Sequence, residues 1–253
     1  MRFPKTTDLT EIKKVAVLFL NVDIKKHDGG ELYPIFCLHP FTNTAIVFIN
    51  GYHDGVPFNL DEDCEGMSLW RNKMLKLIDG CEDVFSLMLL ITDNYKLAFF
   101  KEILPYLSKA DMSKMLGSVW TDLEHPNNNG VITQRKMLSL FRNSDPESLM
   151  DEGERETFRK LPATVKVYRG VTEYNKKNVN VLSWTTSKQT ATWFAERFRG
   201  QGTVYTATIL REHILACFDG RNEHEVIVDP AFLEIQNSAP VGKNAASRKR
   251  DDT

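Results

Sequence analysis

The feature that most constrains this chain is a short apolar run with two carboxylates at its mouth. Val226 to Val228 are β-branched and are predicted to form a buried strand, which Asp229-Pro230 closes. Side chains alternate in an extended chain, so Glu223 and Glu225 are expected on one side and His224 on the other. Two carboxylates on one face of a buried strand repel each other and lose hydration, so they require a cationic partner or a ligand. The alternative is a solvated acidic loop that happens to precede a strand.

Length and composition place the chain among ordinary globular proteins. Its 253 residues suffice for one large domain or two small ones, and 42% hydrophobic with 26% charged residues argues against disorder. The formal net charge of -2 gives no overall attraction to nucleic acid or to an anionic membrane. A generic nucleic-acid coat protein is therefore disfavoured, although a local basic channel is not.

The cysteines and the N-terminus indicate a cytoplasmic protein without a metal. Cys37, Cys64, Cys81 and Cys217 are scattered, with no CxxC and no histidine at ligand spacing, so we expect reduced thiols. The N-terminal residues lack an apolar signal core, and no run is long enough to cross a membrane. The acidic run 61–66 imitates a calcium loop, but its twelfth position holds an asparagine where that loop requires a glutamate.

The first 160 residues are predicted to form a β-hairpin and a helical region. Residues 14–22 are expected as a strand, and residues 35–38 and 44–49 as the two arms of a hairpin. From about residue 67 the pattern is helical, with a helix buried on all sides over 85–91. Further helices are expected to begin with a capping box at 108–111 and with Asp145-Pro146, as N-cap and first residue.

Residues 161–237 are richer in strands. Strands are predicted over 165–168, ending at Arg169-Gly170, and over 179–187, 204–209 and 214–218, with a helix over 190–198. Residues 238–253 are polar, carry the cluster Arg248-Lys249-Arg250 and are expected to be a disordered tail. The sequence thus predicts an α+β protein, with the helical part integrated with or covering the strand-rich core.

Three polar sites in this second part suit a sugar-phosphate ligand. Arg169 offers a planar guanidinium that grips phosphate oxygens, and Gly170 allows close approach of the backbone. Ser183 and Thr185 are expected on one strand face with two hydroxyls. With the carboxylate pair, these groups suit cleavage through an oxocarbenium-like centre.

The order of these motifs resembles the R-S-E class of mono-ADP-ribosyltransferases, particularly its small bacterial and phage-encoded members. The resemblance rests on Arg169, then S-x-T followed by the helix Ala191-Thr192-Trp193-Phe194-Ala195, then E-x-E before an apolar strand, and it covers residues 161–235. It implies a split β-sandwich core that binds NAD as a substrate and uses no metal.

The resemblance also implies roles for the cofactor-binding residues. Arg169 would hold the pyrophosphate of NAD, and the backbone of Gly170 would meet the nicotinamide carboxamide. Ser183 would orient the catalytic glutamate and the nucleotide, with Thr185 supporting the strand geometry. The chain departs from the usual S-T-S at Trp184 and at Thr186-Ser187, so a register with Thr185 and Ser187 as the hydroxyl pair remains open.

The two glutamates would divide the chemistry between them. Glu225 would bond the 2′-hydroxyl of the nicotinamide ribose and stabilise positive charge as nicotinamide leaves. Glu223 would meet the target and accept its proton. An acidic residue at this position of the class accompanies arginine modification, so protein arginine is the favoured target.

Several alternatives remain open from the sequence. ADP-ribosylation of RNA or DNA bases is one, with Lys188, Arg197, Arg199 and the Arg248-Lys249-Arg250 cluster as a phosphate track; the simpler interpretation of the first three is a solvated helix face. NAD glycohydrolysis and a non-catalytic binding module of the same fold are others. Arg169 can instead be a surface ion-pair partner, and the aromatic residues Trp184, Trp193 and Phe194 are expected in the core. The resemblance further suggests a toxin or an effector in bacterium–phage conflict, with an inhibitory antitoxin protein as a partner and no membrane partner.

Overall fold

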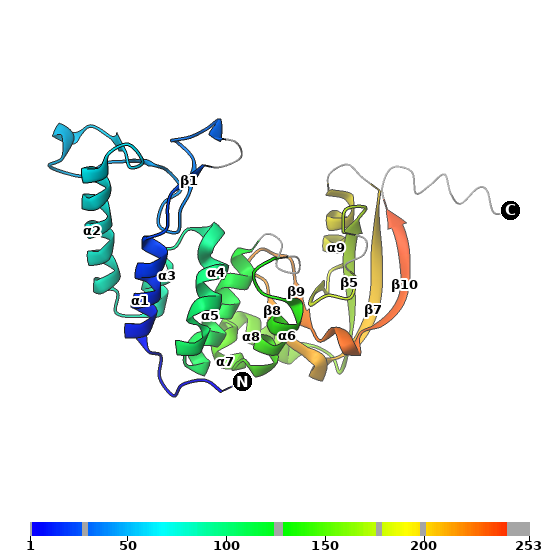
Figure 1. Ribbon diagram of the computed structural model, residues 1–253. Coiled ribbons are helices and arrows are strands. Elements are labelled where there is room, and N and C mark those ends of the chain that lie inside the picture. The colour runs from blue at the N-terminus through cyan, green and yellow to red at the C-terminus, as the bar shows by residue number, and fades with distance from the viewer. Residues whose placement is uncertain (1, 27–29, 124–128, 176–178, 198–200, 242–253) are drawn as a thin grey trace. The chain divides into compact units, whose positions relative to one another are not determined.

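The computed structural model describes residues 2–26, 30–123, 129–175, 179–197 and 201–241 (Figure 1). The chain divides into two compact units, Met1–Leu123 and Glu124–Thr253. The division falls earlier than the boundary after residue 160 expected from the sequence. Helices that the sequence placed in the N-terminal region therefore belong to the C-terminal unit. The predicted α+β class is confirmed, because the chain combines helices with antiparallel sheet.

The N-terminal unit is mainly helical, with two short two-stranded sheets. Its helices are α1 (Leu9–Leu20), α2 (Cys64–Gly80), α3 (Val84–Met88), α4 (Asp93–Ile103) and α5 (Lys109–Asp122). Its strands pair as β1 (Lys25–Lys26) with β2 (Cys37–Leu38), and β3 (Ile46–Val47) with β4 (Phe58–Asn59). The core comes chiefly from the helices and includes Ile12, Ala16, Leu20, Leu87, Phe99, Phe100, Ile103, Met112 and Trp120.

The strand predicted over residues 14–22 is wrong, because residues 14–20 are part of α1. The Asp8 side chain caps the helix by accepting from the backbone N–H of Glu11 at 3.1 Å. Ile12, Ala16 and Leu20 are fully buried at a spacing of four residues, which is helical periodicity. The continuous apolar run hides that spacing, because Leu18 is apolar but lies exposed.

The hairpin predicted from residues 35–38 and 44–49 is also wrong. Two backbone bonds do join these segments, Cys37 N to Asn43 O at 2.8 Å and Ala45 N to Pro34 O at 3.0 Å. However, β2 pairs with β1, and β3 pairs with β4. The long turn between the two segments leaves each free to pair with a different partner.

The predicted start of the helix at Ser108 is confirmed, whereas the buried helix predicted over 85–91 is not. Ser108 caps α5 by accepting from the N–H of Asp111, but its own N–H bonds to the Thr7 hydroxyl, so the reciprocal half of the capping box is replaced. Leu89, expected inside a buried helix, follows the end of α3 and is 82% exposed.

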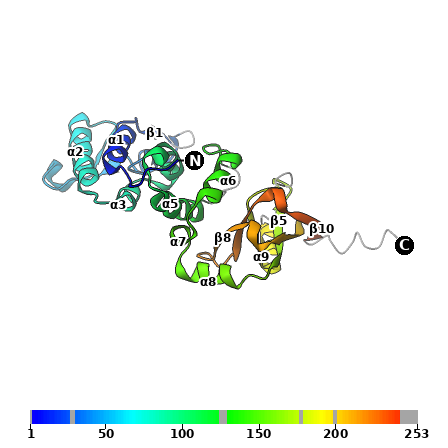
Figure 2. The same ribbon diagram turned by 90° about the horizontal axis from the view of Figure 1, so that it is seen from below.

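The C-terminal unit contains four α-helices, two short 3-10 helices and one six-stranded sheet in the part that the structure describes (Figure 2). The sheet has the order β10-β7-β5-β6-β9-β8, and every neighbouring pair is antiparallel. The elements are α6 (Gln134–Asn143), α7 (Pro146–Leu149), α8 (Glu152–Lys160), β5 (Thr164–Thr172), β6 (Ser183–Thr185), α9 (Lys188–Glu196), β7 (Gly202–Leu210), β8 (Ile214–Phe218), β9 (Glu225–Val228) and β10 (Glu234–Val241).

The sheet has two halves of different construction. In the long half, made of β10, β7 and β5, strands β5 and β7 stay in register from Thr164↔Leu210 to Thr172↔Gly202. In the short half, made of β6, β9 and β8, strands β6 and β9 share only three pairs. The halves are joined by one pair, Tyr168↔Thr185, between β5 and β6. We call this pair, together with residues 169–172 of β5 and Ser183 and Trp184 of β6, the junction.

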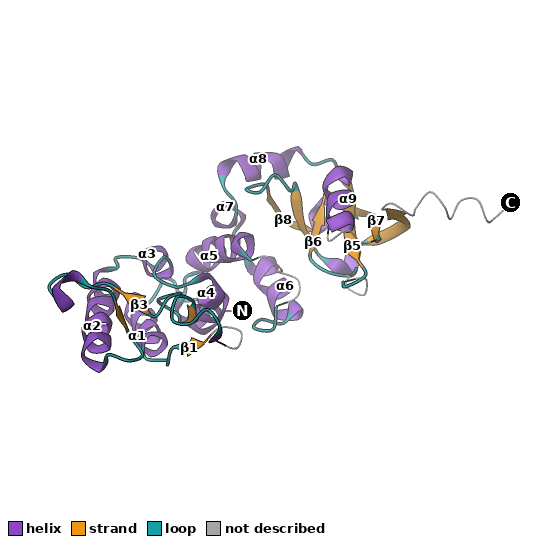
Figure 3. Cartoon of the chain, turned by 90° about the horizontal axis from the view of Figure 1, so that it is seen from above, coloured by secondary structure: helices purple, strands orange, loops and turns teal. Residues whose placement is uncertain are grey.

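Helix α9 packs closely on the long half (Figure 3). A Cβ atom on Gly170 of β5 would lie 1.9 Å from the carbonyl oxygen of Ala191, and one on Gly202 of β7 would lie 2.0 Å from that of Ala195. Ala191 and Ala195 are themselves fully buried. Small residues on both surfaces are therefore what allow the helix to contact the sheet.

The predicted strands and helix of this unit are present, with corrections to their bounds. The strand expected over 179–187 is limited to β6, and Ser187 is instead the N-cap of α9. β5 continues to Thr172, so Arg169-Gly170 lies within the strand and not at its end. β10 contains residues 238–241, which the sequence assigned to a disordered tail. The rest of that tail, including Arg248-Lys249-Arg250, lies outside the described residues.

Candidate active site

The short half of the sheet brings a serine onto a buried glutamate. Glu225 is the first residue of β9, lies opposite Thr185 of β6 and is only 6% exposed. The Ser183 hydroxyl donates a hydrogen bond to Oε1 of Glu225. A carboxylate that has lost its water needs such donors, because its negative charge is otherwise uncompensated. The sequence singled out both residues, and the structure places them in contact.

Arg169 lies where the two halves of the sheet separate. Beyond Tyr168↔Thr185, β5 and β6 have no further register pairs, and Nη1 of Arg169 donates to the carbonyl oxygen of Ser183 at 2.7 Å. Burial lowers the pKa of Arg169 to about 10, while the nearby carboxylate of Glu225 acts in the opposite direction. The guanidinium is thus still charged at neutral pH. One site therefore holds a cation and an anion, linked through Ser183.

Gly170 has a packing role that the sequence did not predict. Its bare Cα is required by α9, whose backbone leaves no room for a side chain at this position. The expected contact between the Gly170 backbone and the nicotinamide carboxamide stays a prediction.

The hydroxyl groups of the alternative register have other partners. Thr185 donates to the carbonyl oxygen of Glu223 at 2.7 Å and accepts from the N–H of Ser187 at 3.0 Å. The Ser187 hydroxyl accepts from the N–H of Thr190 at 3.1 Å and caps α9. Within the described contacts, Ser183 is therefore the hydroxyl that reaches Glu225, and Thr185 braces the neighbouring loop.

Glu223 does not share a strand face with Glu225, contrary to the expectation from alternation. Asn222 and His224 have φ of 54° and 47°, in the left-handed region, so the chain is not extended before Glu225. Glu223 lies in a loop of residues 219–224, and its Oε2 is 3.3 Å from Nη2 of Arg221. The two carboxylates thus have separate environments, one buried against Ser183 and one 26% exposed beside an arginine.

This loop 219–224 is held by hydrogen bonds along its length. The N–H of Asn222 donates to Asp219 O at 2.8 Å, and that of His224 to Asp219 Oδ1 at 3.1 Å. On the sheet side, Thr186 N donates to His224 O at 3.1 Å, next to the Thr185–Glu223 bond. The position of Glu223 is therefore fixed from within the loop and from β6.

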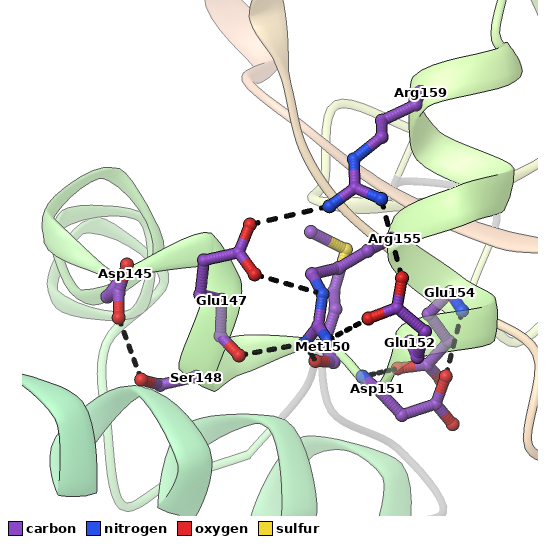
Figure 4. Close-up of polar contacts among 9 residues, drawn as sticks. All are labelled: Asp145, Glu147, Ser148, Met150, Asp151, Glu152, Glu154, Arg155 and Arg159. Atoms are coloured by element: carbon purple, nitrogen blue, oxygen red, sulfur yellow. Dashed lines mark hydrogen bonds and ion pairs between the residues drawn. The ribbon is translucent and has the colours of Figure 1, made fainter.

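Helix α8 anchors the first residue of the loop. Oε1 of Glu154 accepts from the N–H of Asp219 at 3.3 Å, and its other oxygen completes a capping box with Asp151. Burial raises the pKa of Glu154. Figure 4 shows that Arg155 of α8 forms ion pairs with Glu147 of α7 and with Glu152 in the first turn of α8.

The remaining aromatic and basic candidates lie on β6 and on or next to α9. Trp184 is buried as predicted, but Trp193 is 61% exposed on α9, so its assignment to the core is wrong, and Phe194 is only half-buried. The Arg197 guanidinium lies 5.6 Å from the Trp193 ring and 5.5 Å from the Phe194 ring. Arg199 lies outside the described residues. A shallow surface hollow on this helix is lined by Lys188, Gln189, Thr192, Trp193 and Glu196. It contains none of the predicted catalytic or NAD-binding residues.

Sequence reasoning missed Arg221, Asp219 and Glu154. Arg221 lies two residues before Glu223, and Asp219-Gly220 is a turn dipeptide, so both signals were local. Glu154 lies 65 residues before its partner Asp219, and no pattern in one sequence connects them.

The described residues contain no group of three or more His, Cys, Asp or Glu side chains able to hold a metal ion. Among the helices that the structure describes, none is both long and apolar enough to cross a membrane.

Comparisons with protein-family models, curated proteins and solved structures found no match to this chain. The site's geometry and the motif resemblance therefore carry the functional inference.

Proposed function

We propose that this protein is a mono-ADP-ribosyltransferase that cleaves NAD at the junction of its sheet. The observation that supports this most strongly is the connected set of Arg169, Ser183 and Glu225, in which the serine bonds the glutamate through its hydroxyl and the arginine through its carbonyl. A buried carboxylate and a half-buried guanidinium, held together where two strands separate, are costly to maintain for structure alone.

The chemistry assigned to Glu225 follows from its burial. As the bond between C1′ of the ribose and nicotinamide breaks, positive charge develops on the ribose. A fixed carboxylate in a site poor in water stabilises that charge without reorganising, an effect commonly of about 3 kcal/mol or more. Ser183 restricts the carboxylate to one orientation.

Arg169 is the proposed holder of the pyrophosphate. Its planar fork matches phosphate oxygens, which a lysine ammonium does not. Since Arg169 belongs to β5 and bonds β6, NAD bound to it would lie at the point where the two halves of the sheet diverge.

Protein arginine is the proposed target. Glu223 is partly exposed in the loop 219–224 and already lies beside the guanidinium of Arg221. A carboxylate in this position can hold a target guanidinium and accept its proton.

A nucleic-acid base is the second candidate target. The exposed Trp193 beside Arg197 on α9 supports it, because an aromatic ring with a neighbouring cation can stack a base and contact a phosphate.

The test is incubation of the purified protein and a cell extract with NAD that is labelled in its adenylate part. We expect label on protein, resistant to nuclease. We also expect Glu223→Gln to lose transfer while still releasing nicotinamide slowly. Label removed by nuclease would identify a nucleic acid as the target, and label found only as free ADP-ribose would identify a glycohydrolase. If the protein releases no nicotinamide from NAD, the proposed function is wrong.

A further inference from the structure

The loop 219–224 already contains an arginine at the carboxylate proposed to receive a target arginine. Nη2 of Arg221 lies 3.3 Å from Oε2 of Glu223, and the Arg221 side chain is 39% exposed. The left-handed φ of Asn222 turns the chain between the two residues. The pair is therefore formed within the loop itself.

The loop presents this pair without a large entropic cost. Its ends are held by bonds from Asp219 to Glu154 and from His224 to Thr186, and Glu223 is fixed through its carbonyl by Thr185. A group that is already positioned beside a reaction centre has a high effective concentration. Any acceptor from another protein has to compete with it.

We propose that Arg221 accepts ADP-ribose from the reaction centre of its own chain. The proposal rests on the proposed function. A guanidinium nitrogen of Arg221 forms a bond to C1′ of the nicotinamide ribose, and the bond from C1′ to the nicotinamide nitrogen breaks. Nicotinamide leaves with the bonding electron pair, and the proton lost from the guanidinium passes to Glu223 and then to water. The products are ADP-ribosyl-arginine, nicotinamide and one proton.

Arg142 provides a matched control within the same unit. Its Nη2 and Nε lie 2.5 Å and 2.8 Å from Oδ2 of Asp229, so it too is an arginine paired with a carboxylate. Asp229 follows the far end of β9 from Glu225, a separation of four strand residues or roughly 13 Å. Pairing with a carboxylate is common to both arginines. What distinguishes Arg221 is that its partner is Glu223, the carboxylate proposed to receive a target arginine.

The first experiment incubates the full chain with NAD alone and locates ADP-ribose by tandem mass spectrometry. We expect modification of Arg221 and none of Arg142. Arg221→Lys should lose at least tenfold of the label on the protein while still transferring ADP-ribose to agmatine, a free guanidine compound. Arg142→Lys should be labelled like the parent.

The second experiment tests whether the transfer is intramolecular. An affinity-tagged Glu225→Gln chain is mixed with the active, untagged protein, and the two are separated after reaction. We expect no label on the tagged chain, and a fraction of modified active protein that does not depend on its concentration.

Two results would overturn the inference. Label on agmatine with Arg221 unmodified would show a working site that does not use this acceptor, and equal label on the tagged chain would show transfer between molecules. Absence of nicotinamide release and of agmatine labelling would refute the proposed function, and the inference with it.

Discussion

The two halves of the six-stranded sheet differ in the extent of their strand pairing and in the residues that they carry. The long half keeps β5 and β7 paired along nine residues of each strand and receives α9 on its surface. The short half pairs β6 and β9 over three residues and contains Ser183, Thr185 and Glu225. The candidate site lies where pairing between β5 and β6 stops after one register pair, so the carbonyl oxygen of Ser183 is able to accept a hydrogen bond from the Arg169 side chain.

From this contrast we expect two kinds of substitution, those that lower the stability of the fold and those that lower the rate of the reaction. Packing residues of the long half are expected to affect stability, and polar residues of the short half to affect the reaction. The variants below test that separation, beginning with the largest effect.

Gly170→Ala should have the largest effect, on stability. Its Cβ would lie 1.9 Å from a backbone oxygen of α9, and such overpacking should lower the free energy of unfolding by about 3 kcal/mol or more. Urea denaturation measures it. Gly220→Ala is the control, because a Cβ there meets nothing within 4 Å. Equal stability of the two variants would contradict the packing account of α9.

Ser183→Ala should act mainly on the reaction. The carboxylate of Glu225 loses a donor, which for a bond to a charged group is worth about 2 kcal/mol, or roughly thirtyfold in the rate of nicotinamide release. Ser187→Ala removes a hydroxyl from the α9 cap instead, and should cost about 1 kcal/mol of stability with the rate within about twofold. If Ser187→Ala were the slower enzyme, the alternative hydroxyl register would be the correct one.

Arg169→Lys should weaken NAD binding about tenfold, close to 1.4 kcal/mol, because an ammonium cannot reproduce the bidentate fork. Isothermal titration calorimetry with NAD measures it. Arg211→Lys serves as the control, since Arg211 bonds the backbone carbonyls of Arg159 and Leu161 on the surface. Unchanged affinity in Arg169→Lys would make Arg169 a structural prop of the junction.

Glu154→Gln should have the smallest effect, on acceptor use. It weakens the anchor at Asp219, which should raise the KM for agmatine about threefold, or about 0.6 kcal/mol, and leave the KM for NAD unchanged. Glu156→Gln on the same helix is the control, because Glu156 pairs with Lys160. A rise in the KM for NAD would show that α8 supports the whole site and not the loop alone.

The sequence predicted the C-terminal unit better than the N-terminal one for a physical reason. Strand β9 can be recognised in the sequence because it is a short β-branched run with clear ends at Glu225 and Asp229. The run within α1 is apolar on its exposed side too, so periodicity could not distinguish helix from strand.

Within the candidate site, the limits of sequence reasoning lie in the loop 219–224. The resemblance implied that Ser183 orients Glu225, and the two side chains are in contact. The left-handed residues Asn222 and His224 broke the alternation that placed Glu223 beside Glu225, and neither position is a glycine that would have signalled the turn. Glu154 depends on tertiary contact alone.

The most direct test of the junction as an NAD-cleaving site is the rate of nicotinamide release by Glu225→Gln. The amide keeps the shape of the side chain but loses the charge, so the rate should fall at least about a hundredfold with the melting temperature nearly unchanged. Glu234→Gln, the same change on exposed β10 of the long half, should leave the rate unaltered. A rate for Glu225→Gln within about tenfold of the parent, which is less than 1.4 kcal/mol, would contradict the assignment of Glu225 and the account of the junction.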